Sequence, residues 1–244
     1  STGEAWGGGK VIRVQVFLAI ILASLGLVLG IGAESRAAAK GRAGTFLITT
    51  STNGLGSGWV LNPDGLAVTA AHVVGDANSF QATFADGDVR DGVVIAMDRA
   101  TDLALLRIDP APVLHPLPLA QTALMGTRVI AMGAPGGRLG TVTRGQITSL
   151  NARPTDQISV GLIQHSAPLA QGSSGGPLLK GQGEVVGVNI GILTQDDRQG
   201  TSPSPIGYAV PIDQVRQAIL RMQASERRSP TPLPWAQREK SAQG

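Results

Sequence analysis

The hexapeptide Gly172-Ser173-Ser174-Gly175-Gly176-Pro177 is the stretch that decides how this sequence is interpreted. Glycines flank two serines, so the chain can turn tightly here and adopt backbone conformations that other residues avoid. Such a turn exposes a serine hydroxyl and lets nearby backbone N–H groups converge on one point, as a nucleophilic serine requires. The same composition also suits a flexible Gly/Ser loop, and the hexapeptide alone does not separate the two interpretations.

Two other segments carry residues that could activate a serine. Thr69-Ala70-Ala71-His72-Val73-Val74 places a histidine directly after small residues at an expected strand end, where its ring can reach across a cleft. Thr101-Asp102-Leu103-Ala104-Leu105-Leu106 places a carboxylate at the start of an apolar strand, where it could be buried against a histidine. Asp98 is the competing carboxylate, and its neighbours Met97 and Arg99 indicate a solvated turn instead.

The remaining histidines indicate no metal site. His115 lies in a proline-rich stretch and is expected at the surface, whereas His165 ends a strand and is expected in the core or in a cleft wall. No two of the three histidines share a metal-ligand spacing, and the chain has no cysteine. Disulfides, thiol catalysis and thiolate metal sites are therefore excluded, and we expect neither a metal nor a cofactor.

Length and composition favour an all-β domain. The 244 residues are 42% apolar, which is enough for a buried core and argues against disorder. The 33 glycines and 15 prolines follow no Gly-X-Y repeat, so they predict many short turns.

The basic charge lies at the two ends of the chain. Residues 1–42 hold five basic and two acidic side chains, residues 43–226 hold eleven and fourteen, and residues 227–244 hold four and one. The expected folded part is therefore mildly acidic. A nucleic-acid-binding fold would carry its basic patch on the fold itself, so no nucleic-acid partner is expected.

Residues 14–33 form an almost unbroken apolar run after the N-terminal segment 1–13. Twenty helical residues span about 30 Å, the thickness of a bilayer core, so the run predicts a transmembrane anchor. The alternative is a long signal sequence cleaved near Ala37-Ala38-Ala39, although a signal core is usually shorter. Residues 34–44 are rich in small residues and are expected to form a linker.

From residue 45 the pattern changes to short strands and turns, and Asn62-Pro63-Asp64-Gly65 is the strongest turn signal. Strands are expected at 45–50, 56–61, 66–69, 79–84, 89–97, 103–108, 128–132, 141–150, 160–165, 185–190 and 206–210. The proline-rich linker 111–126 divides them into a first barrel, 45–110, and a second barrel, 127–211. Residues 212–226 predict a helix whose apolar stripe is Val215, Ile219, Leu220 and Met222, and residues 227–244 predict a disordered tail.

The order His72, Asp102, Ser174 resembles that of the chymotrypsin-like proteases, and the surrounding motifs resemble the HtrA (Deg) branch. Eight motifs run in family order: Gly56-Ser57-Gly58, Asn62 to Gly65, Thr69 to Val74, Thr101 to Leu105, Met132-Gly133-Ala134-Pro135, Thr141-Val142-Thr143-Arg144-Gly145, Gly172 to Pro177, and Gly207-Tyr208-Ala209-Val210-Pro211. The resemblance implies two six-stranded β-barrels with the catalytic residues His72, Asp102 and Ser174 at their junction. It also implies an oxyanion hole made by the backbone N–H groups of Gly172 and Ser174.

Three departures from the family pattern stand out. Position 173 is Ser, where the family usually has Asn, and positions 165–166 are His-Ser, where relatives often have Thr-Asp. Without an acidic residue at position 173, activation should depend on loop ordering. Only residues 227–244 follow the expected helix, so a PDZ domain is either absent or was cut away from this chain.

The resemblance implies a serine endopeptidase that cuts misfolded or regulatory proteins, and the apolar run 14–33 is expected to tether it to the cell membrane. Its protease domain would lie on the periplasmic or extracellular side, or be exported in soluble form if the anchor is cleaved. The alternative is a protease-like binding module that holds unfolded segments without cutting them. Relatives commonly form trimers, so a homotrimer is implied.

The specificity pocket is expected to be built by Leu169, Ala170 and Gln171 and by the strand Val188, Asn189, Ile190 and Gly191. None of these side chains is charged, which predicts cleavage after small or medium aliphatic residues, because a buried unpaired Lys or Arg is costly. The alternative is that this strand belongs to the core and the pocket is lined elsewhere.

Overall fold

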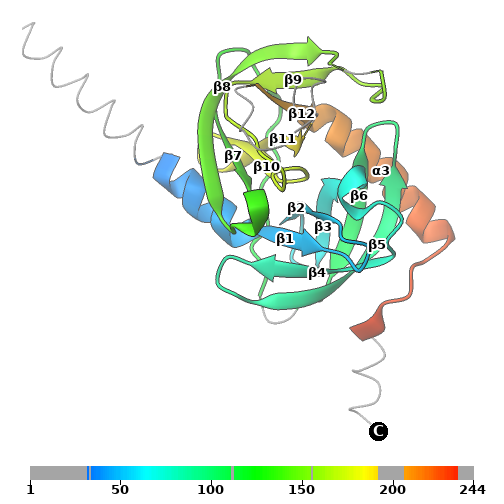
Figure 1. The fold of residues 1–244 in the computed structure, drawn as a ribbon. Helices are drawn as coiled ribbons and strands as arrows, with labels where there is room; N and C mark the ends of the chain where they lie inside the picture. Colours follow the sequence, from blue (N-terminus) through cyan, green and yellow to red (C-terminus); the bar gives the residue numbers. More distant parts are fainter. Residues whose placement is uncertain (1–31, 33, 111–112, 155, 192–205, 236–244) are drawn as a thin grey trace, which may run out of the picture.

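Two closed β-barrels lie side by side with a long helix, α3 (Ile212–Arg228), along their flank (Figure 1). The computed structural model describes residues 32, 34–110, 113–154, 156–191 and 206–235. Each barrel has six strands, and the strand pairs within both barrels are antiparallel. The expected all-β fold with two six-stranded barrels and a C-terminal helix is confirmed.

The first barrel closes in the order β1-β2-β3-β6-β5-β4. Its strands are β1 (Thr45–Thr49), β2 (Leu55–Val60), β3 (Leu66–Ala70), β4 (Ser79–Phe84), β5 (Val89–Asp98) and β6 (Leu103–Ile108). A single helical turn, α2 (Ala71–Val74), follows β3 directly.

The predicted turn at residues 62–65 joins β2 to β3. The side-chain oxygen of Asn62 accepts the N–H of Leu66 at 3.0 Å, which closes the turn. Gly65 has φ +87°, and a Cβ at this position would overlap the carbonyl oxygen of Ile108. Only glycine suits this position, because it combines a left-handed backbone with close backbone contact.

The second barrel closes in the order β10-β11-β12-β9-β8-β7. Its strands are β7 (Arg128–Gly133), β8 (Thr141–Ala152), β9 (Leu162–His165), β10 (Pro177–Lys180), β11 (Glu184–Ile190) and β12 (Gly207–Pro211). The sequence did not predict β10, because its four residues begin at the end of the glycine-rich hexapeptide and are too few to show an alternating pattern.

The few aromatic residues are concentrated in the first barrel. Phe46 is fully buried and stacks on Phe80 with ring centroids 6.4 Å apart, and Phe84 lies tilted at 5.3 Å on the same ring. Trp59 is also fully buried. Burial of each such side chain contributes roughly 1.5–3 kcal/mol to the free energy of unfolding. These rings therefore stabilise the first barrel, which carries the residues on its rim.

The helix α3 (Ile212–Arg228) packs against both barrels. Val215, Ile219 and Met222 are buried as the apolar stripe predicts. Leu220 is 65% exposed, so its assignment to that stripe was wrong. Successive helical residues differ by about 100° in direction, which turns Leu220 away from the face that Ile219 buries.

Two arginines fasten α3 to the rest of the fold. Arg221 contacts the carboxylate of Asp98 at the end of β5, with Nε 3.1 Å from Oδ2. Arg216 donates a hydrogen bond of 2.7 Å to the carbonyl of Ala120, in the segment between the barrels. Asp98 is therefore ion-paired and 13% exposed, and the expectation that it is a solvated turn residue was wrong.

The C-terminal part is more ordered than the sequence indicated. The helix continues two residues beyond the expected end at 226. Trp235 is only 8% exposed, although it falls in the stretch expected to be a disordered tail. A large apolar ring gains from burial even in a proline-rich segment. The remainder of the expected tail, 236–244, lies outside the described residues.

Residues 34–44 form a helix, not the expected linker. Alanine is the best helix former, and this segment contains four alanines. Ala37 is fully buried, and Gly41 lies so close to the second barrel that a Cβ there would be 2.8 Å from Leu179 Cδ1 and 3.1 Å from Met132 Cε. Tertiary packing against the barrel thus stabilises a helix that small residues alone did not reveal.

The expected membrane anchor, residues 14–33, lies outside the described residues except for Gly32. Within the part of the chain that the structure describes, no helix has the length and apolar character needed to cross a membrane.

Candidate active site

His72 and Asp102 form a double contact at the rim of the first barrel. Asp102 Oδ2 lies 2.6 Å from His72 Nδ1, and Asp102 Oδ1 accepts the backbone N–H of His72 at 2.9 Å. The imidazole side chain is 45% exposed and the carboxylate only 15%. One carboxylate therefore fixes both the position and the ring orientation of the histidine, and leaves Nε2 for chemistry.

The local backbone explains this geometry. Asp102 has φ +55°, a left-handed conformation that aspartate tolerates better than most residues. Its carbonyl accepts the N–H of Ala71 at 3.0 Å, so the residue before β6 is bound to the residue after β3. Asp98 instead contacts α3, so of the two carboxylates considered it is Asp102 that meets His72.

The hexapeptide 172–177 makes the tight turn expected from its glycines. Gly172 and Gly175 have φ of +98° and +83°. A Cβ at Gly172 would lie 2.5 Å from the carbonyl oxygen of Ala134, and a Cβ at Gly175 would overlap the carbonyl oxygen of Ser57. The turn is thus an ordered, tightly packed element rather than a flexible Gly/Ser loop.

Ser174 lies within this turn and is held by the backbone on two sides. Its carbonyl oxygen accepts the N–H of Ser57 on β2 at 2.8 Å. Its hydroxyl accepts the N–H of Gly191 at 2.9 Å. The residue as a whole is 8% exposed.

Gly56 connects the turn with the histidine. A Cβ at Gly56 would lie 2.5 Å from both methyl groups of Val73 and 3.1 Å from the carbonyl oxygen of Ser174. Val73 directly follows His72 on α2, so Ser174 and the histidine segment flank the same glycine. The segments that carry the three predicted catalytic residues therefore meet at one junction, although no hydrogen bond joins His72 to Ser174 among the described residues.

Two backbone N–H groups of the turn are free to bind a ligand. Among the described residues, no protein acceptor bonds to the N–H of Gly172 or of Ser174. The carbonyl of Gln171 accepts the N–H of Gly136 at 2.9 Å. Because a trans peptide directs its C=O and N–H to opposite sides, this bond turns the Gly172 N–H away from residue 136.

A family model for the trypsin-like peptidase domain matches residues 56–188. The chain belongs to the trypsin-like peptidase family. The mitochondrial serine protease HTRA2 of Bos taurus is 38% identical over 172 residues, which are 68% of this chain and 36% of the relative. The putative serine protease HhoA of Synechocystis sp. is 39% identical over 171 residues, which are 67% of this chain and 41% of the relative. This trypsin-like peptidase therefore spans well under half the length of these relatives.

Solved structures of serine proteases share the fold. The HtrA-type protease AlgW with a tripeptide superposes with a TM-score of 0.68 at 28% identity, covering 78% of this chain and 62% of that one. The serine endoprotease from Yersinia pestis gives a TM-score of 0.64 at 28% identity, covering 77% and 65%. The resemblance to the HtrA branch that the ordered motifs indicated is confirmed.

The seven residues expected to form the specificity pocket differ in exposure in this trypsin-like peptidase. Gln171 and Gly191 are exposed and flank the Ser174 turn, so they can contact a substrate directly. Ala170 is half-buried. The other four are buried, and three of them lie on β11 where it pairs with β12: Leu169, Val188, Asn189 and Ile190.

His165 is fully buried, as expected for a core histidine, and His115 is exposed, as expected for a surface one. The pKa of His165 is lowered to about 4 because burial disfavours the charged ring. The Ala167 backbone and the Asn189 side chain oppose this shift, yet neither ring nitrogen has a hydrogen bond of ordinary geometry within the described residues. The ring lies over Gly207, its direct partner on β12.

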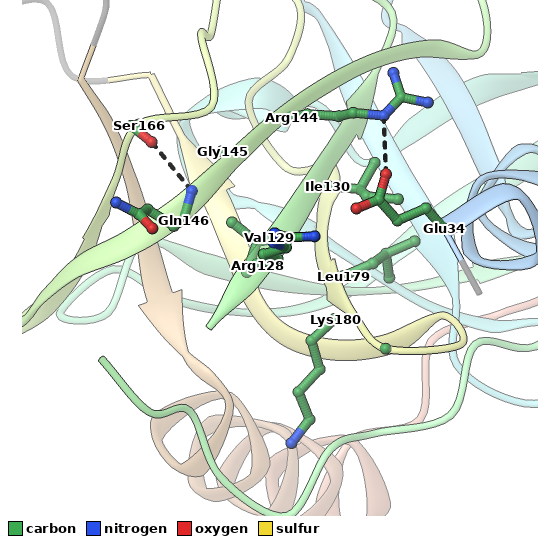
Figure 2. Close-up of a pocket in the computed structure, with 11 residues that line it drawn as sticks. Glu34, Arg128, Val129, Ile130, Arg144, Gly145, Gln146, Ser166, Leu179 and Lys180 are labelled. Carbon is green, nitrogen blue, oxygen red and sulfur yellow. Dashed lines mark hydrogen bonds and ion pairs between the residues drawn. The ribbon is translucent and has the colours of Figure 1, made fainter. Parts of the chain in front are cut away.

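A separate pocket of about 490 Å³ opens on the outer side of the second barrel (Figure 2). Arg128, Arg144 and Lys180 line it together with Glu34, and Arg144 Nε lies 3.5 Å from the Glu34 carboxylate. None of the predicted site residues contributes to its wall. This pocket is thus separate from the candidate active site.

Proposed function

We propose that the chain is an HtrA-type serine endopeptidase that hydrolyses peptide bonds with Ser174, His72 and Asp102. Ser174 Oγ attacks the peptide carbonyl while His72 Nε2 takes its proton, and His72 then gives that proton to the leaving amine. Asp102 holds the ring so that Nδ1 carries a proton, and it stabilises the imidazolium that forms. Water repeats the sequence to release the acyl group.

The observation that best supports this assignment is the double contact between Asp102 and His72. A single exposed histidine would rotate freely, whereas bonds to its Nδ1 and to its own N–H restrict the ring to one orientation. Preorganisation of this kind is what general-base catalysis requires, because the proton acceptor must stay within hydrogen-bond reach.

The N–H groups of Gly172 and Ser174 would form the oxyanion hole. Both belong to the tight turn, and neither is bonded to a protein acceptor among the described residues. One such donor typically contributes about 2.7–4 kcal/mol to transition-state stabilisation.

We propose unfolded or regulatory proteins as substrates, cleaved after small or medium aliphatic residues such as Val, Ala, Ile or Leu. The residues flanking the Ser174 turn carry no charge that could neutralise a Lys or Arg side chain. Discrimination between neighbouring aliphatic residues should be modest, about 1–3 kcal/mol per methylene. Mass spectrometry of a digested unfolded protein tests this, and a majority of cuts after Lys or Arg would overturn the pocket assignment.

Location is also part of the proposal. The relative from Rickettsia conorii is named a probable periplasmic serine endoprotease, which supports export of this chain. We propose that residues 14–33 tether the protease domain to the membrane, outside the cytoplasm, and that the domain assembles as a homotrimer. Fractionation of cells with a permeabilised outer layer, followed by added protease, tests the topology, and light scattering tests the assembly.

The decisive test of the reaction is labelling of the full chain with a fluorophosphonate probe. Ser174→Ala should abolish both labelling and peptide hydrolysis, since triad members act as a unit worth about 10⁶ in rate. Ser173→Ala is the matched control: its hydroxyl is 3.4 Å from the N–H of Ala170, so its loss should have a mild effect. Equal hydrolysis by Ser174→Ala and the parent would refute the assignment.

The same experiment decides against the non-cutting alternative. A protease-like module that only holds unfolded segments would suppress their aggregation without being labelled by the probe. Labelling of the parent at Ser174 is therefore the outcome that selects the enzyme.

A further inference from the structure

We propose that Ser57, a residue of the first barrel, is a positioning residue for the oxyanion hole of the second. This inference rests on the proposed function and assigns Ser57 no contact with substrate. The serine is the middle residue of the Gly56-Ser57-Gly58 motif on β2, and it is fully buried.

The Ser57 hydroxyl makes two hydrogen bonds that cross from one barrel to the other. It donates to the carbonyl of Gly172 at 2.6 Å, across 115 positions of sequence. It accepts the N–H of Ala134 at 2.9 Å. Ala134 directly follows β7, so one hydroxyl joins β2, the end of β7 and the turn that carries Ser174.

Two carbonyls flank the N–H of Gly172, and both are held. The carbonyl of Gln171 is bound by the N–H of Gly136, and that of Gly172 is bound by the Ser57 hydroxyl. Gly172 has φ +98° and no side chain, so its own backbone preferences do not fix the direction of its N–H. The two anchors supply that direction, and the second one comes from the opposite barrel.

The residue type at position 57 follows from this role. The bridge needs one group that donates and accepts at once, which a hydroxyl does and an amide N–H or carbonyl does not. The space is also restricted: a Cβ on Gly133 would lie 3.0 Å from Ser57 Oγ and 2.9 Å from Ser173 Cα. The glycine of the Met132-Gly133-Ala134-Pro135 motif therefore leaves the room in which the bridge forms.

The test compares Ser57→Ala with the parent in the full chain, using a peptide substrate and a peptide aldehyde inhibitor. The aldehyde forms a tetrahedral adduct whose oxygen occupies the oxyanion hole, so it reports on that site separately from substrate binding. Ser57→Ala should lower kcat by about 10- to 100-fold, the scale of a small misplacement of catalytic groups. KM should stay within about twofold, while affinity for the aldehyde falls by the same factor as kcat/KM.

Ser57→Cys is the second variant, because it nearly preserves shape but replaces the hydroxyl with a weak donor. This variant keeps the proposal testable if Ser57→Ala fails to fold. The introduced cysteine cannot form a disulfide within the chain, because the chain has no other cysteine. We expect a melting temperature near that of the parent and a kcat reduced about tenfold. Ile48→Val, at a fully buried position on β1, is the control for general destabilisation of the first barrel and should leave kcat unchanged.

The outcomes separate the two proposals. If the parent is neither labelled by the fluorophosphonate nor active, the proposed function fails. If the parent is active but folded Ser57→Ala or Ser57→Cys keeps the parental kcat and aldehyde affinity, the role of Ser57 is overturned. A loss that appears only in melting temperature, matching Ile48→Val, also overturns it.

Discussion

The backbone N–H of Gly191 donates a hydrogen bond of 2.9 Å to the hydroxyl of Ser174. A Cβ at position 191 would lie 2.6 Å from that same Oγ. The space beside the Ser174 hydroxyl therefore accommodates a glycine at position 191 but not a residue with a side chain. The residue after β11 therefore limits where the nucleophile of the proposed reaction can stand.

Gly191→Ala should lower kcat/KM about 100-fold, because the added methyl group forces Ser174 Oγ or residue 191 out of place. Hydrolysis of a peptide substrate, with the melting temperature measured in parallel, checks this. Gly32→Ala is the matched control, because among the described residues a Cβ at Gly32 meets only Arg36, at 3.7 Å. Parental kcat/KM in Gly191→Ala would contradict the crowding argument.

Asp102→Asn should lower kcat about 10⁴-fold with little change in fold, because an amide in place of the carboxylate favours the wrong tautomer of His72. Asp98→Asn is the matched substitution: it weakens the pair with Arg221, whose side chain is 54% exposed, and leaves His72 untouched. Its kcat should be that of the parent, because Asp98 contacts Arg221 and not His72. An equal loss of kcat in Asp102→Asn and Asp98→Asn would contradict the proposal that Asp102 orients His72.

His165 should make the protein less stable in mild acid. Its folded pKa of about 4 lies below the unfolded value of 6.5, so the unfolded chain takes up the proton first as pH falls. The contribution of His165 to the free energy of unfolding is therefore complete above about pH 6.5 and is lost progressively towards pH 4, by about 3 kcal/mol in total.

Urea unfolding at several pH values between 4 and 7 measures this effect. His165→Leu, which is similar in volume and does not titrate, should flatten the pH dependence. The exposed His115→Gln should leave the parental pH dependence in place. A parental slope in His165→Leu would show that other groups cause the acid sensitivity.

The helix at residues 34–44 should contribute measurably to stability. Gly41→Val should lower the free energy of unfolding by about 1–3 kcal/mol, because the new side chain overlaps Leu179 and Met132. Ala39→Val makes a similar change on the exposed side of the same helix and should cost less than about 1 kcal/mol. Equal effects would mean that the helix does not pack on the barrel in solution.

The strand pattern, which is a local signal, predicted the two barrels, and the resemblance to the HtrA branch implied that His72 and Asp102 meet. The contact between Ser57 and Gly172 could not be predicted from the sequence, since it joins residues 115 positions apart and depends on how the barrels meet. Residues 34–44 were misjudged for a related reason: the partner that stabilises the helix, Leu179, lies far along the chain. Tertiary contacts of this kind produce no periodic pattern and no motif in the sequence.

The attachment of α3 has a consequence for cooperativity. Arg221 binds the first barrel and Arg216 the segment between the barrels, while the apolar face of the same helix packs on both. Opening the junction by a hinge motion would break these bonds together with the bridge through Ser57. The two barrels should therefore melt in a single calorimetric transition, and substrate must enter by rearrangement of loops within one rigid frame rather than by separation of two domains.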